Sequence, residues 1–294
     1  MFFSDILARK RFLLSDGAIG TELAKKGLRP GDCPELLNAD DPPVIAEIAR
    51  SYVDAGSDII LTNTFGGNPV KLARYGLESR MDELNEKGVR IAVEAAGGRA
   101  AVFASIGSTG EFLEPLGTFT ESDMVDVYAR QVRALVRGGV EGFVFETMSD
   151  LGEILCALKA VRENSDLPAV SSMTFDKGMR GYATMMGITP DRAAAELEAA
   201  GSDVVGANCG TGIVDAVEIA RAMRSHTGLP LWMKPNAGMP ELIGGRTVYR
   251  ETPEAFGARV PDLIDAGASI VGGCCGAAPD HIRSIRSALD RFGS

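Results

Sequence analysis

One pattern of apolar and polar positions recurs along this chain of 294 residues. An amphipathic helical stretch ends in glycine, and a short, wholly apolar run follows, as in residues 47–63, 129–147, 193–209 and 258–275. Glycine often follows the last turn of a helix, and a continuous apolar run is typical of a strand buried on both faces. Helices that alternate with such strands predict a parallel sheet.

Eight strands are expected, near residues 12–16, 58–63, 100–106, 142–146, 169–174, 203–208, 230–235 and 269–273. Helices are expected near residues 43–55, 81–96, 122–138, 150–163, 190–200, 213–226, 253–266 and 279–291. Eight strands, each followed by a helix, predict an α/β fold with one domain over residues 1–294, a (β/α)8 TIM barrel. An open, doubly wound sheet is the alternative. The long loops 107–120 and 236–252 are candidates for lining a site.

Charge and composition narrow the function classes. The net charge of −10 argues against nucleic acid or an anionic membrane as a partner. Asp5, Arg9, Lys10 and Arg11 interrupt the apolar N-terminal residues, so no signal peptide is expected, and no apolar run is long enough to span a bilayer. We therefore predict a cytoplasmic protein, whose five cysteines are free thiols or metal ligands.

Three of the five cysteines follow strands of the expected barrel. Cys209 ends the sixth strand, and Cys274 with Cys275 ends the eighth, so all three can face one pocket at the C-terminal mouth, where barrel active sites lie. A catalytic zinc ion keeps three protein ligands and one open position. The glycines of GGCCG (272–276) let adjacent cysteines aim at one ion. Small buried thiols or a vicinal disulfide are the alternatives.

The remaining cysteines and the histidines lie elsewhere. Cys156 falls in a helix and is expected in the core, whereas Cys33 falls in a loop and its role is open. His226 and His281, the only histidines, fall in helical stretches away from the strand ends. A histidine-rich metal site is therefore not expected.

The composition of the cysteine site favours a particular chemistry. Three thiolates on Zn²⁺ leave a net charge of about −1, so the metal is a weak Lewis acid for hydrolysis. It still binds an incoming thiol as the thiolate, which is the nucleophilic form. The site therefore indicates activation of a thiol rather than of water.

Polar residues at other strand ends are candidates for holding the rest of the substrate. Asp16 and Glu146 end the first and fourth strands and could bind a cationic group, although helix capping is as common. If the thiol belongs to an amino acid, the backbone N–H groups around Gly17 and Ala18 could hold its carboxylate. Asn63, at the end of the second strand, is a further candidate for binding the substrate.

Short motifs in one order span almost the whole chain. They are DGAIGTEL (16–23), GSDIILTNTFGGN (56–68), GSTGE (107–111), FETMSD (145–150), MTFD (173–176), GANCG (206–210), KPNAGMP (234–240) and GGCCG (272–276). With these motifs the chain resembles the homocysteine S-methyltransferases. That family includes the homocysteine-binding module of cobalamin-dependent methionine synthase and the betaine–homocysteine and S-methylmethionine–homocysteine enzymes.

The resemblance implies a role for each candidate. The three cysteines bind zinc, the two acids hold the homocysteine ammonium, and the backbone around Gly17 and Ala18 holds its carboxylate. Asn236 is implied as a fourth zinc ligand that the homocysteine sulfur displaces. The sulfur then attacks the donor methyl group, which gives methionine.

The methyl donor is less well defined. Animal betaine enzymes carry aromatic residues where this chain has Gly66 and Thr147, and a quaternary ammonium donor usually needs an aromatic cage. We therefore expect a methyl-corrinoid protein or methylcobalamin as donor, on a partner because the chain has no room for cobalamin modules. Betaine or S-methylmethionine stays an alternative, since DCPELLN (32–38) and EPLGTFT (114–120) resemble bacterial betaine-type enzymes. A non-catalytic zinc- or amino-acid-binding subunit is the remaining alternative.

Overall fold

A ring of parallel strands forms the centre of the structure, a computed structural model that describes residues 10–244 and 246–292. Its strands are β1 (Leu13–Leu14), β2 (Ile59–Leu61), β3 (Ala101–Ile106), β4 (Gly142–Met148), β5 (Ala169–Met173), β8 (Val204–Gly212), β9 (Leu231–Asn236) and β12 (Ala268–Val271). Their order in the sheet is β1-β12-β9-β8-β5-β4-β3-β2. A parallel bridge between Ser15 and Ile59 joins the two outer strands, β1 and β2. The TIM barrel is confirmed, and the open sheet is wrong.

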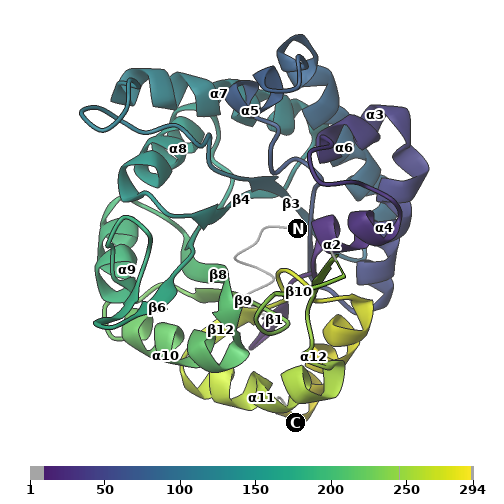
Figure 1. Cartoon of the computed structure of the whole chain (residues 1–294), viewed down its shortest axis with the longest axis vertical. Helices are drawn as coiled ribbons and strands as arrows, with labels where there is room; N and C mark the ends of the chain where they lie inside the picture. Colours follow the sequence, from purple (N-terminus) through teal and green to yellow (C-terminus); the bar gives the residue numbers. More distant parts are fainter. Residues whose placement is uncertain (1–9, 245, 293–294) are drawn as a thin grey trace.

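Helices surround the ring on its outer side (Figure 1). The eight that the sequence predicts are α4 (Pro42–Asp54), α6 (Met81–Ala96), α7 (Glu121–Gly138), α8 (Leu151–Asn164), α9 (Pro190–Ala199), α10 (Ile213–Arg224), α11 (Pro253–Asp265) and α12 (Pro279–Phe292). Local chemistry sets their ends. In α7, Thr120 and Asp123 form a capping box at the start, and Gly139 follows the last turn with a φ of 99°.

Two apolar layers hold the barrel together. Each of the eight barrel strands sends side chains into the interior, which is filled by Leu13, Ile59, Leu61, Ala101, Phe103, Val144, Val170, Val204, Trp232 and Ile270. The alternate residues face outward and join the larger core between the sheet and the helices. A barrel interior filled in this way is a packed core rather than a pore, so a ligand must bind at the mouth.

Several short elements were not predicted. They are α2 (Ile19–Lys25), α3 (Leu37–Asp40), α5 (Pro69–Ala73), the 3-10 turns η1 (Pro34–Leu36) and η2 (Glu78–Arg80), and the hairpins β6 (Asp176–Gly178) with β7 (Gly181–Ala183) and β10 (Glu241–Ile243) with β11 (Arg246–Val248). All of them lie in connections that follow barrel strands. They are too short to show a periodic pattern, which needs a window of about 11–18 residues for a helix.

The sequence predicts neither a membrane-spanning segment nor a signal peptide. Among the described residues, no helix combines the length and apolarity needed to cross a bilayer. Residues 1–9, where no signal peptide is expected, lie outside the described residues.

The contact between β8 and β9 gives a test of the packing. A Cβ at Gly206 would lie 2.0 Å from the backbone oxygen of Trp232. We expect Gly206→Ala to lower the free energy of unfolding by about 1–3 kcal/mol, as is typical of overpacking. Urea unfolding of the zinc-free protein measures this. Gly20→Ala in α2 is the control, because nothing lies within 4 Å of its Cβ position. Equal midpoints for the two variants would contradict the packing described.

Candidate functional site

The structure brings the three predicted cysteine ligands together at the mouth of the barrel. The sulfurs of Cys209, Cys274 and Cys275 all lie within 4.8 Å of one another, and those of Cys209 and Cys275 are 4.0 Å apart. Tetrahedral zinc with bonds of about 2.3 Å separates two sulfurs by about 3.8 Å. All five cysteines are free thiols, so the vicinal disulfide is wrong. Within the described residues, this is the one group of Cys, His, Asp and Glu atoms close enough to hold a metal.

Backbone hydrogen bonds fix the cysteine loop to the end of β9. The Cys274 N–H donates to the Pro235 oxygen at 2.8 Å, and the Ala237 N–H donates to the Cys275 oxygen at 2.9 Å. Asn236, the last residue of β9, is 3% exposed, and its Nδ2 donates to the Gly210 oxygen at 2.7 Å. Its Oδ1 is buried without a hydrogen-bond partner. A buried oxygen of this kind normally has a partner, so the donor set fits a metal ion that takes three sulfurs and this oxygen.

The three thiols of the cluster affect one another's protonation. The pKa of Cys275 is lowered because Cys209 and Cys274 donate hydrogen bonds to its thiolate. The pKa of Cys209 is raised because it donates hydrogen bonds to Cys274 and Cys275. The three thiols therefore share their protons unequally, with Cys275 the one whose thiolate is favoured. A divalent cation would release the remaining protons.

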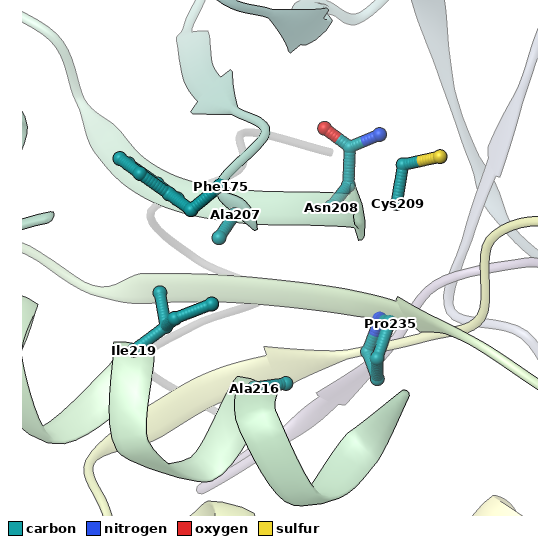
Figure 2. Close-up of a pocket in the computed structure, with 7 residues that line it drawn as sticks. All are labelled: Phe175, Ala207, Asn208, Cys209, Ala216, Ile219 and Pro235. Carbon is teal, nitrogen blue, oxygen red and sulfur yellow. The ribbon is translucent and has the colours of Figure 1, made fainter. Parts of the chain in front are cut away.

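Asn208 organises the backbone around the cysteines, and sequence reasoning missed it. Its Oδ1 accepts from the Thr147 N–H at 2.8 Å and from the Ser172 hydroxyl at 2.7 Å. Its Nδ2 donates to the Thr147 hydroxyl at 2.8 Å and toward the Cys274 sulfur at 3.7 Å. Figure 2 shows Asn208 and Cys209 pointing away from α10, whereas Ala207 points toward it. The only signal in the sequence was its place beside a cysteine at a strand end.

Two residues at this point adopt a strained backbone conformation. Thr147 has a φ of 59° and Cys209 a φ of 61°, in the left-handed region that non-glycine residues rarely occupy. Such strain persists where surrounding contacts over-determine the conformation, and it is typical of functional sites. Here Asn208 hydrogen-bonds to both the backbone and the hydroxyl of Thr147.

The two predicted acids lie in different environments. Asp16 is 1% exposed and already paired, because its Oδ1 accepts from Lys234 Nζ at 2.7 Å and its Oδ2 accepts from the Leu61 N–H at 2.7 Å. Glu146 faces a cavity and accepts a hydrogen bond from the Ser105 hydroxyl. Burial raises the pKa of the Glu146 carboxyl to about 7, against the opposing charge of Lys234. The acids are therefore not equivalent partners for a ligand.

One cavity of about 500 Å³ joins these groups. Its wall includes all three cysteines, Glu146 and Lys234, together with Gly17, Ala18 and Asn63. This volume is within the range of small-molecule sites. The cavity is therefore the place where a substrate can reach the sulfurs and a carboxylate at once.

The remaining predicted substrate residues line this cavity, but their polar groups are partly engaged. The Ala18 N–H donates to the Ala277 oxygen at 3.0 Å. A Cβ at Gly17 would lie 2.3 Å from that same oxygen, so only glycine fits there. Asn63 Nδ2 donates to the Pro34 oxygen and to Asn38 Oδ1. Substrate binding by these residues stays a prediction.

Two aromatic rings line the cavity from positions other than 66 and 147. Phe65 and Tyr249 contribute to the wall, although Gly66 and Thr147 carry no ring. Tyr249 follows the unpredicted β10–β11 hairpin and packs on Gly276, beside the cysteines. The lack of an aromatic residue at positions 66 and 147 therefore does not leave the cavity without aromatic surface.

The other cysteines and the histidines lie outside the cluster. Cys156 is buried in α8, as predicted. Cys33 is also buried, and its thiol donates to Glu35 Oε2 at 3.3 Å. His281 packs against Phe256, and His226, just after α10, has its Nδ1 3.2 Å from the Ala222 oxygen. None of these residues takes part in the group of possible metal ligands.

Comparisons with known proteins show what this chain is similar to. A family model described as homocysteine S-methyltransferase matches residues 13–289. Methionine synthases from Mycobacterium tuberculosis and Mycobacterium leprae are each 31% identical, over 97% and 96% of this chain. The chain covers 25% and 24% of the length of these two relatives.

The barrel is also similar to a solved structure, the metallated form of the homocysteine methyltransferase MmuM from Escherichia coli. The TM-score is 0.81 at 22% identity, and the match covers 96% of this chain and 98% of that one. This likeness supports the fold. The homocysteine S-methyltransferase family model matches nearly the whole chain. The resemblance inferred from the motifs is confirmed, and the chain belongs to the homocysteine S-methyltransferase family.

Proposed function

We propose that this protein transfers a methyl group to the thiol of homocysteine at a zinc ion held by Cys209, Cys274 and Cys275, and so forms methionine. The observation that carries the proposal is the convergence of these three thiols on a cavity that also contains Glu146. The similar barrel from Escherichia coli was solved in a metallated form, so a barrel of this fold can hold a metal.

In this proposal the chain's own residues prepare the site. A bound zinc ion supplies the positive charge that keeps the substrate sulfur in its nucleophilic thiolate form. Asn236 Oδ1, buried without a partner, fits the fourth ligand position before substrate binds. Asn208 Nδ2 donates toward the Cys274 sulfur and so stabilises negative charge there. Glu146 faces the cavity and would hold the substrate ammonium.

A methyl-corrinoid carried by a partner protein is the donor that we propose. The methionine synthase relatives support it, because they are several times longer than this chain and match it over about a quarter of their length. A small cationic donor, such as betaine or S-methylmethionine, is the second candidate. Phe65 and Tyr249 favour it, since aromatic faces attract such cations.

Zinc content tests the ligand assignment. We expect one zinc ion per chain in the purified protein, and Cys274→Ala should lose most of it together with activity, because a three-sulfur site loses a ligand. Metal analysis after gel filtration measures this. Cys156→Ala is the matched control, since Cys156 lies in the core of α8. Full zinc content in Cys274→Ala would show that the cysteines do not bind the metal.

The pH dependence of product binding tests Glu146. Methionine has the same ammonium and carboxylate as homocysteine but no thiol proton to release. The pKa of Glu146 is raised to about 7, so the carboxylate form is lost as pH falls through 7. We expect methionine to bind about tenfold more weakly at pH 6 than at pH 8, by calorimetry.

The Glu146→Gln variant is the control for that measurement. It should bind methionine weakly, and its affinity should not change between pH 6 and pH 8. It should also keep its zinc, because Glu146 is not among the possible metal ligands. The role assigned to Glu146 fails if the wild-type protein shows no change in affinity across this range.

A donor panel tests the reaction itself. Zinc-loaded protein is incubated with homocysteine and methylcobalamin, betaine or S-methylmethionine, and methionine is quantified. We expect methionine from methylcobalamin, and faster turnover when a corrinoid protein carries it. Turnover with only betaine or S-methylmethionine would establish the second candidate. Absence of turnover with every donor, a corrinoid protein included, would favour a non-catalytic subunit.

A further inference from the structure

His281 joins the two loops that meet at the cysteine site. It is 7% exposed and lies in the first turn of α12, directly after the loop that carries Cys274 and Cys275. Its Nδ1 is 3.2 Å from the backbone nitrogen of Ala278, and its Nε2 is 2.9 Å from the backbone oxygen of Glu251. Glu251 lies in the connection from β9 to α11, so the ring contacts both loops at once.

These two contacts define the form of the His281 ring. A backbone N–H can only donate, so Nδ1 accepts from Ala278 and carries no proton. In the neutral ring the proton is then on Nε2, which donates to the Glu251 oxygen. The first bond resembles the return contact of a capping box, in which a side chain of the first helical turn accepts from the residue before the helix. The second bond leaves the helix, so capping alone does not account for this residue.

The Glu251 backbone closes the base of the connection that contains β10 and β11. Its N–H donates to the Ala237 oxygen at 3.2 Å, and the Ala237 N–H donates to the Cys275 oxygen at 2.9 Å. The bond from His281 completes a closed ring of contacts that begins and ends at the cysteine loop. His281 supplies the one side chain in this ring. It therefore fixes the connection to the loop that holds two of the three cysteines.

The same connection brings Tyr249 to the cysteines. Tyr249 and Cys275 both line the cavity, and a Cβ at Gly276 would lie 2.4 Å from the Tyr249 Cβ. The other two cysteines lower the pKa of the Cys275 thiol most, and a hydrogen bond with Tyr249 adds to this effect. Tyr249 is two residues from Glu251, so a shift of the Glu251 backbone would move the ring.

We propose that His281 is a positioning residue that acts through the Glu251 oxygen. It holds Tyr249 against Cys275 and so slows the loss of metal from the three sulfurs. Residues that orient metal ligands typically cost about 10–100-fold in metal affinity when they are replaced. The metal part of this inference rests on the proposed function, because it takes the cysteines to bind zinc. The attachment of the connection does not, and it can be measured in protein without zinc.

Substitutions at position 281 separate the helix cap from the bond to Glu251. The side chain introduced by His281→Asn or His281→Ser can still accept from the Ala278 N–H, but it is too short to reach the Glu251 oxygen. The longer amide introduced by His281→Gln has both an acceptor and a donor and can replace both contacts. We therefore expect all three variants to fold, and only His281→Gln to keep the bond to Glu251.

Trypsin cleavage of zinc-free protein measures this attachment. Arg250 is exposed, and the peptide bond after it leads into Glu251, whose N–H and oxygen are both hydrogen-bonded. Cleavage there needs local opening, so we expect it to be at least about tenfold faster in His281→Asn and His281→Ser than in the wild-type protein. His281→Gln should be cut at close to the wild-type rate. Cleavage after Arg180, in the exposed turn between β6 and β7, is the internal control and should not change.

Zinc release to a chelator tests the link to Tyr249. We expect His281→Asn and Tyr249→Ala each to release zinc at least about tenfold faster than the wild-type protein. If His281 acts through Tyr249, the double variant should release zinc no faster than Tyr249→Ala alone, because two residues that act through one contact are not additive.

Two results would overturn the inference. In one, His281→Asn and His281→Ser are cut after Arg250 at the wild-type rate. In the other, the effects of His281→Asn and Tyr249→Ala on zinc release multiply in the double variant, which is the result for two independent structural residues. A failure of the proposed function looks different, because the wild-type protein would then bind no zinc while the cleavage rates would still separate the variants.

Discussion

Closure of the barrel between β1 and β2 is the constraint on which the site depends. Two aspartates hold this seam. Asp58 Oδ2 accepts the Leu14 N–H at 2.9 Å, and Asp16 Oδ2 accepts the Leu61 N–H at 2.7 Å. Because the sheet closes, the C-terminal ends of all eight strands meet at one mouth. Cysteines that lie 65 residues or more apart in sequence thereby come within 4.8 Å of each other. The Asp16 carboxylate thus helps to close the barrel and also pairs with Lys234.

The sequence predicted most of this arrangement because its signals are local and repeated. All eight strands and eight outer helices follow from periodicity and glycine positions, and Cys209, Cys274 and Cys275 follow from their places after strands. The order of the strands in a barrel then places the three cysteines at the same mouth. The convergence of the three cysteines was therefore accessible from sequence, because it depends on topology rather than on the orientation of side chains.

The rest of the site depends on contacts that no local pattern encodes. The Lys234–Asp16 pair joins residues 218 positions apart, and a lysine at a strand end looks like an ordinary polar residue. The hydrogen bonds of Asn208 depend on the left-handed backbone at Thr147, which a β-branched residue does not suggest. The hairpin before Tyr249 is too short for periodicity to identify. Each of these features is fixed by tertiary packing, which overrides residue preference.

The balance of charge explains how a lysine can be buried in the wall of the cavity. Lys234 pairs with Asp16 at 2.7 Å, and its positive charge also acts on Glu146. Under the proposed function, zinc held by three thiolates would carry about −1, and a substrate thiolate would add another negative charge. The substrate ammonium would offset part of that charge. Methylation would turn the thiolate into a neutral thioether, which is a much weaker metal ligand, while the contacts to its amino-acid end would remain. Under the proposed function, the affinity for product should therefore depend chiefly on Glu146, and the preference for thiol over thioether on the cysteines.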